Sequence, residues 1–79
     1  MRNLDNASAE LLTDIAKFCF LLGVEHARRR QRRITAQDLL DSWRQRFGVE
    51  SWRRFHTSKF RQVYGAGYDM AYATDRLSA

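Results

Sequence analysis

Hydrophobic residues recur at helical spacing in three stretches of the chain. The first stretch has an apolar stripe, which a second set of small and apolar residues widens: Leu11, Ile15, Phe18 and Leu22, then Leu12, Ala16, Cys19 and Val24. Asn6 or Ser8 is a suitable N-cap for this stretch, and its basic C-terminal end suits the helix dipole. We therefore predict a first helix over about residues 7–31.

The second stretch predicts a helix over about residues 35–47. Thr35 is a good N-cap, Asp38 follows three residues later, and Gly48 is a natural left-handed stop. The apolar positions between these signals have helical spacing: Ala36, Leu39, Leu40, Trp43 and Phe47.

After Gly48, the pattern predicts a short extra helical turn near residues 49–55 and a last helix over about residues 57–75. Thr57 or Ser58 is the expected cap of that last helix. Its apolar face comprises Phe60, Val63, Tyr64, Gly67, Tyr68 and Ala71. A change of direction at Gly48 would bring Trp43 and Trp52 into one core. The fold class expected is all-α: a compact bundle of three main helices in a single domain, residues 1–79.

Composition agrees with a packed helical domain. The chain is 44% hydrophobic and 13% aromatic, with no proline and four glycines. The apolar run from Ile15 to Val24 includes Lys17 and is too short to span a bilayer, so no membrane association is expected. Cys19 is the single cysteine, which excludes an internal disulfide and favours a reduced, cytoplasmic setting.

Charge is concentrated in the middle of the chain. Residues 26–61 have a net charge of +8, whereas residues 1–25 have −2 and residues 62–79 have −1. Of the 14 basic residues 12 are arginine, whose planar fork suits phosphate or carboxylate. The candidate nucleic-acid or anion-binding residues are Arg28, Arg29, Arg30, Arg32, Arg33, Arg44, Arg46, Arg53, Arg54, Lys59 and Arg61.

The run from Arg28 to Arg33 places five guanidinium groups within six residues, which repel each other unless an anion or carboxylates compensate. The first hypothesis is a small nucleic-acid-binding module, regulatory or architectural, that contacts phosphates through this surface. The alternative is an interaction or inhibitor protein, of the size that phages and plasmids encode. It would bind an acidic or nucleic-acid-binding surface of a larger host complex. A solvated helix end without a specific partner is the third interpretation.

Two resemblances to DNA-binding folds are incomplete. Residues 39–55 are similar to a helix-turn-helix, but Arg44 and Arg54 stand where that motif has a small and a buried apolar residue. Residues 25–40 resemble the end of the long helix, the basic loop and the short helix of the histone fold. This resemblance would imply dimers, with Arg32, Arg33 and Thr35 near phosphates, although the family's first short helix has no counterpart here. We assign neither family.

Aromatic residues have two interpretations. Trp43, Trp52 and Phe60, each followed by arginine, could stack on bases, but their helical spacing first predicts core positions. Small residues at Gly67 and Ala71 allow another helix to approach closely. The approaching helix would come from the same chain or from a partner, and in the second case the docking anchors would be Tyr64, Tyr68 and Tyr72. Self-association through the first helix, as a homodimer, is also expected because a domain this small gains from a shared core.

Other chemistry finds no support in the sequence. His26, His56 and Cys19 lack the paired spacing of zinc ligands, so no metal and no cofactor are expected. A thiol within an apolar run has a raised pKa and makes a poor nucleophile. No glycine-rich phosphate loop is present. We therefore expect a binding protein and not an enzyme.

Overall fold

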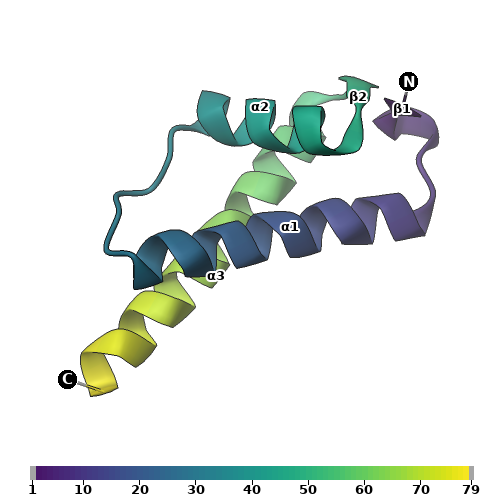
Figure 1. The fold of residues 1–79 in the computed structure, drawn as a ribbon. Coiled ribbons are helices and arrows are strands. Elements are labelled where there is room, and N and C mark those ends of the chain that lie inside the picture. Colours follow the sequence, from purple (N-terminus) through teal and green to yellow (C-terminus); the bar gives the residue numbers. More distant parts are fainter. Residues whose placement is uncertain (1, 79) are drawn as a thin grey trace.

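The computed structural model describes residues 2–78 of the chain, and the side chains of residues 2–77. Figure 1 shows α3 crossing behind α1, while α2 lies above α1 in this view. The three-helix bundle predicted from the sequence is confirmed. The elements, in chain order, are β1 (Arg2–Asn3), a 3-10 helix η1 (Leu4–Asn6), α1 (Ala9–Arg28), α2 (Ala36–Phe47), β2 (Val49–Ser51) and α3 (Arg54–Ser78).

Three of the predicted helix ends have the expected local chemistry. Ser8 caps α1, because its hydroxyl accepts a hydrogen bond from the Leu11 amide at 3.2 Å. Thr35 caps α2 in the same way, accepting from the Asp38 amide at 3.1 Å. Gly48 ends α2 in the left-handed region, with φ of 65°, where a glycine meets no Cβ penalty.

The segment after Gly48 differs from the prediction. Val49–Ser51 is a short strand, not a helical turn, and it pairs in parallel with β1, with Arg2 opposite Val49. Val49 is buried, so the strand fixes the N-terminal residues against the core. The helix-turn-helix resemblance fails for the same reason, since no helix begins until Arg54.

The start of α3 is also earlier than predicted, at Arg54 instead of about residue 57. Neither Thr57 nor Ser58 caps it. The Arg53 amide instead donates to Nδ1 of His56 at 3.1 Å, which resembles the backward half of a capping box. Thr57 donates its hydroxyl proton to the Arg54 carbonyl at 2.8 Å. His56 is buried and therefore has a structural role at this helix start.

Helices α1 and α3 cross in direct backbone contact at two glycines. A Cβ atom added at Gly23 would overlap the carbonyl oxygen of Tyr64, and one added at Gly67 would overlap the carbonyl oxygen of Phe20. The close approach predicted for the Gly67 region is thus made within the chain. It leaves no room for a side chain at either glycine, because a backbone carbonyl cannot rotate away as a side chain can.

The main core lies where the three helices meet η1 and β2. Trp43 is 1% exposed and packs edge-on against Phe60 and Trp52, with ring centroids 5.2 and 6.2 Å apart. The predicted convergence of the two tryptophans is confirmed, although Trp52 follows strand β2 and does not lie on a second helix. The fully enclosed residues of this core are Leu4, Ile15, Cys19, Leu39, Trp43, Val49, Phe60 and Tyr64.

Burial makes the fold sensitive to alkali. It raises the pKa of Cys19 from its ordinary value of 9.0 to about 12, and burial is also the main cause of a raised pKa at Tyr64. The unfolded chain therefore loses the thiol proton near pH 9, while the folded chain keeps it to about pH 12. Between these values the Cys19 thiol lowers the free energy of unfolding by up to about 1.4 kcal/mol per pH unit.

We accordingly expect urea midpoints to decline from pH 8.5 upwards, and more steeply in the wild-type protein than in Cys19→Ala, which has no thiol to ionise. Chemical denaturation followed by circular dichroism, repeated across that pH range, measures both slopes. Equal slopes for the two proteins would show that the thiol is not protected from ionisation.

Within the described part of the chain, no helix combines the length and the apolar character needed to cross a bilayer.

Candidate functional site

The arginine-rich connection between α1 and α2 has a defined backbone. Helix α1 ends in a Schellman motif, in which the Arg30 amide donates to the Ala27 carbonyl at 3.0 Å and the Gln31 amide to the His26 carbonyl at 2.9 Å. Arg30 occupies the left-handed position of this motif, with φ of 58°, where glycine is the favoured residue. The backbone of the loop therefore turns at a fixed point, and Arg30 is held there.

Two tyrosines of α3 fasten the same loop. The Tyr64 hydroxyl accepts from the Ile34 amide at 3.2 Å and is hydrogen-bonded to Nδ1 of His26 at 2.7 Å. The Tyr68 hydroxyl donates to the Gln31 carbonyl at 2.5 Å. These bonds join the end of α1, the loop and the middle of α3, so the guanidinium groups of the loop are presented by an ordered segment.

Three of the predicted basic residues meet along α3. Arg54 and Arg61 line a hollow between α2 and α3, and Arg61 and Arg33 line the adjoining one, with Ser58 shared by both hollows. Arg33 also forms an ion pair with Asp69, and its guanidinium lies 5.0 Å from the centre of the Tyr68 ring. Arg54, Arg61 and Arg33 thus form a row that runs along α3 from Arg54 to the loop between α1 and α2.

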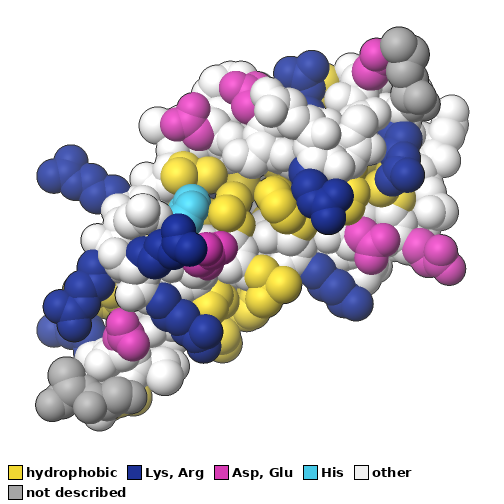
Figure 2. Space-filling view, in the orientation of Figure 1, with side chains coloured by type: hydrophobic (Ala, Val, Ile, Leu, Met, Phe, Trp, Pro, Cys, Tyr) yellow, Lys and Arg dark blue, Asp and Glu magenta, His cyan; other side chains and the backbone are white. Residues whose placement is uncertain are grey.

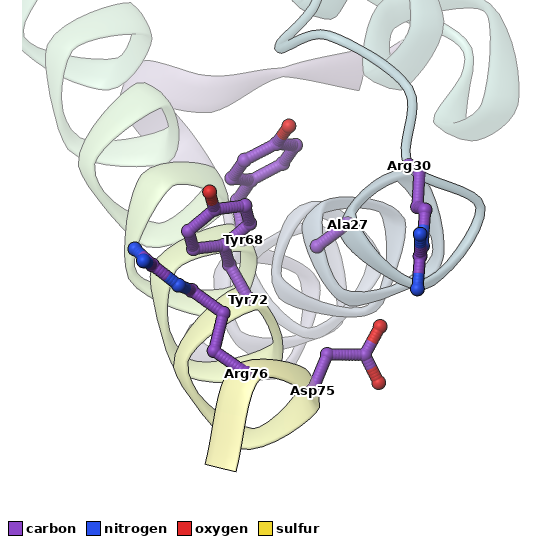
Figure 3. A pocket seen from close by; sticks show the side chains of 6 residues that line it. All are labelled: Ala27, Arg30, Tyr68, Tyr72, Asp75 and Arg76. Carbon is purple, nitrogen blue, oxygen red and sulfur yellow. The ribbon is translucent and has the colours of Figure 1, made fainter. Parts of the chain in front are cut away.

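The row ends in a cavity between the C-terminal parts of α1 and α3 (Figure 3). The cavity has a volume of about 320 Å³ and is lined by Ala27, Arg30, Tyr68, Tyr72, Asp75 and Arg76. Tyr68 and Tyr72 stand on α3 with nearly parallel rings, Ala27 on α1 points toward them, and Arg30 lies farther away at the end of α1. We call the five arginines of the row and the cavity the arginine stripe: Arg30, Arg33, Arg54, Arg61 and Arg76.

The stripe follows α3 for most of its length. Arg54 and Arg76 are 22 residues apart, which corresponds to about 33 Å along a helix axis. In Figure 2, the basic side chains gather toward the end of the molecule where α3 finishes, with few acidic ones between them, whereas acidic side chains are more frequent at the opposite end. Asp69 and Asp75 are the acidic residues beside the stripe.

The other predicted basic residues lie outside the stripe, and most of them have partners within the chain. Arg44 stacks on the Trp52 ring at 4.2 Å, and Arg53 pairs with Asp5 at 2.9 Å. Arg29 pairs with Glu25 at 2.6 Å, Lys59 lies over the Phe55 ring and Arg46 over the Phe47 ring. Arg28 and Arg32 are exposed beside the loop. The continuous basic face expected over residues 28–61 is therefore divided.

The three tyrosines predicted as docking anchors have different positions. Tyr64 is 3% exposed and binds the loop, so its side chain serves the fold. Tyr68 is half-buried and Tyr72 is 50% exposed, and both line the cavity. Sequence reasoning missed Arg76, which lies over the Tyr72 ring at 5.5 Å. Arg76 follows Tyr72 by four residues, about one helical turn, which places the two on one helix face and could have indicated this contact.

Two further features bear on other functions. Among residues 2–77, no three His, Cys, Asp or Glu side chains group closely enough to hold a metal ion.

Leu21 is 63% exposed on α1, beside a shallow apolar hollow that Phe20 and Val63 also line. The homodimer through the first helix stays a prediction, and this is the surface on which it depends.

Comparisons with known proteins add no assignment. No protein-family model matches the sequence, and searches of curated proteins and of solved structures found no match either.

The backbone of Arg30 gives a test of whether its side chain has a role beyond the fold. Arg30→Gly is expected to raise the free energy of unfolding by about 1 kcal/mol, because glycine adopts the left-handed conformation without the cost that a side chain incurs. Urea denaturation measures this gain. A loss of stability would mean that the guanidinium group itself holds the loop.

Proposed function

We propose that the protein is a small nucleic-acid-binding module that contacts phosphates through the arginine stripe and has no catalytic role. One observation supports this most directly. Among the described side chains, four of the five stripe arginines, all except Arg33, have no carboxylate in ion-pair distance. Outside the stripe, Arg29, Arg44 and Arg53 are paired, while Arg28, Arg32 and Arg46 are not. The stripe thus aligns four unpaired guanidinium groups along α3 and at the adjoining end of α1.

Such an arrangement suits a linear polyanion. Repulsion among aligned guanidinium groups is relieved when phosphates bind, and the release of counterions from the nucleic acid drives association. Arginine forks also bind phosphate oxygens in pairs. A nucleic-acid strand bound along the stripe would meet positive charge at both ends and in the middle of α3, over about 33 Å.

Two charge-matched variants test the proposal. The first replaces three stripe residues with glutamine (Arg33, Arg54 and Arg61), and the second replaces three basic residues outside the stripe (Arg46, Arg53 and Lys59). Both lose three positive charges, so a general effect of net charge would weaken them equally. Fluorescence anisotropy with labelled single-stranded DNA, duplex DNA and RNA measures the affinity of each.

We expect the stripe variant to bind at least about tenfold more weakly than wild type and the second variant to stay within about threefold. Circular dichroism of both variants confirms that the fold persists, as all six side chains are exposed. Equal losses in the two variants would contradict a localised interface. The absence of measurable binding by the wild-type protein to all three nucleic acids would overturn the proposal and favour a protein partner.

A further inference from the structure

The cavity at the end of the arginine stripe differs from the rest of the stripe in its lining. Elsewhere the arginines lie over open hollows, but here two aromatic rings and the methyl group of Ala27 provide much of the wall. Its volume of about 320 Å³ is at the lower end of the range for small-ligand pockets, about 300–1,000 Å³. A cavity of this size suits one flat group better than a length of sugar-phosphate backbone.

The two rings are placed for stacking. Tyr68 and Tyr72 are one helical turn apart on α3, their planes differ by 11°, and their centroids are 6.5 Å apart. Tyr68 is held by its bond to Gln31 and by Arg33 on its ring, so its orientation is fixed before a ligand binds. Tyr72 is 50% exposed, with Arg76 over its ring at 5.5 Å, so a base that stacks on Tyr72 would lie beside this guanidinium group. Preorganised aromatic rings of this kind bind bases at little entropic cost.

The charged residues of the cavity indicate where phosphate and base would lie. Asp75 contributes a carboxylate, and in Figure 3 its side chain points across toward the end of α1, on the side of Arg30. A carboxylate repels phosphate but accepts hydrogen bonds from the amino groups of adenine, cytosine or guanine. Arg30 and Arg76, on either side of the cavity, are suited to the phosphates that flank such a base.

We propose that this cavity binds one unstacked, amino-bearing nucleobase of a single-stranded nucleic acid, with its flanking phosphates on Arg30 and Arg76. The inference rests on the proposed nucleic-acid-binding function and adds a strand preference and a base preference to it. Arg30 lines this cavity and has a left-handed backbone conformation. Arginine thus occupies a position of the cavity wall where glycine would be the favoured residue.

The experiment compares Tyr72→Ala with a matched control, Phe55→Ala. Both remove an aromatic ring that is at least half exposed, on the same helix, but Phe55 does not line the cavity. The probes are labelled oligo-dA and oligo-dT of about 20 nucleotides, an abasic phosphodiester chain of equal length and a DNA duplex. The abasic chain offers the stripe its phosphates but offers the cavity no base.

Wild type is expected to bind oligo-dA more tightly than the abasic chain and than oligo-dT. Tyr72→Ala should lose about 5- to 100-fold in affinity for oligo-dA, the range expected for one stacked base, with little change for the abasic chain and the duplex. Phe55→Ala should bind all four probes as wild type does. In Asp75→Asn the preference for oligo-dA over oligo-dT should diminish, because the amide no longer presents two acceptor oxygens.

The inference is overturned if wild type binds oligo-dA and the abasic chain equally, or if Tyr72→Ala binds oligo-dA as wild type does. In those cases the proposed function would still stand, provided that the stripe variant binds all phosphate chains weakly. Both proposals fail together if no probe binds, or if the stripe variant also binds the phosphate chains as tightly as wild type. Displacement of oligo-dA by micromolar AMP would overturn the assignment to a strand, since a free nucleotide has one phosphate for the stripe.

Discussion

Replacement of Gly67 by alanine is expected to lower the free energy of unfolding by about 2–3 kcal/mol. The new methyl group would overlap the Phe20 carbonyl oxygen, and that atom belongs to the backbone of α1. Relief requires the two longest helices to separate at their crossing, which loosens the packing on both sides of it. Urea denaturation followed by circular dichroism gives the change. A domain of this size has a total stability of only about 4–12 kcal/mol, so the effect is large.

Gly65 provides the matched control, two residues away on the same helix. A methyl group there meets only the Nη1 atom of Arg33, at 3.2 Å, and this end of a flexible side chain can shift. Gly65→Ala is therefore expected to stabilise the protein by about 0.5–1 kcal/mol, since glycine is unfavourable inside a helix. If both alanine variants are more stable than wild type, the backbone contact between α1 and α3 is not as close as described.

Trp43→Ala is expected to have the largest effect, a loss of about 3–5 kcal/mol. Trp43 is 1% exposed and contacts the rings of Trp52, between β2 and α3, and of Phe60 on α3. It therefore joins α2 to the rest of the bundle. Its removal leaves a cavity that the surrounding aromatic rings cannot fill without leaving their positions. Chemical denaturation measures the loss, and partial unfolding in the absence of denaturant would be consistent with its upper range.

Trp52→Ala is the control for this prediction. Trp52 packs against Trp43 but is only partly buried and lies outside the helices, so a smaller loss of about 1–2 kcal/mol is expected. A loss for Trp52→Ala equal to that for Trp43→Ala would indicate that the connection after Gly48, and not α2, organises the core.

The helices were predictable because their signals are local. Ser8, Thr35 and Gly48 act within one turn of their own positions, and the apolar spacing of each helix depends only on its own sequence. The segment Val49–Ser51 was not predictable in this way. Its partner is β1, at the other end of the chain, and a strand of three residues has no recognisable alternation of its own.

The candidate site was predicted in part. The arginine-rich loop stands out by composition, but which basic residues share a surface depends on the packing of α3 against the loop. Arg44 and Arg53 are taken up by Trp52 and Asp5, contacts that require the whole fold. Arg76 was missed because the net charge of the last segment is negative, which hides one arginine placed beside Tyr72.

The role of the tyrosines was likewise beyond the sequence. Equal spacing made Tyr64, Tyr68 and Tyr72 look equivalent, whereas each lies at a different depth between α1 and α3. Tyr64 enters the core because it is next to the Gly23 crossing, whereas Tyr72 lines the cavity that Ala27 and Arg30 border at the C-terminal end of α1. The depth of each tyrosine depends on its position relative to the crossing of the two helices, which only the assembled bundle determines.

The salt dependence of binding to a single-stranded oligonucleotide tests the central claim most directly. If the five stripe arginines each neutralise a phosphate, a plot of log affinity against log salt concentration should have a slope of about −3 to −4. The variant that lacks the positive charges of Arg33, Arg54 and Arg61 should have a slope of about −1 to −2. A wild-type slope near zero, or one that the three substitutions leave unchanged, would contradict phosphate binding by the stripe.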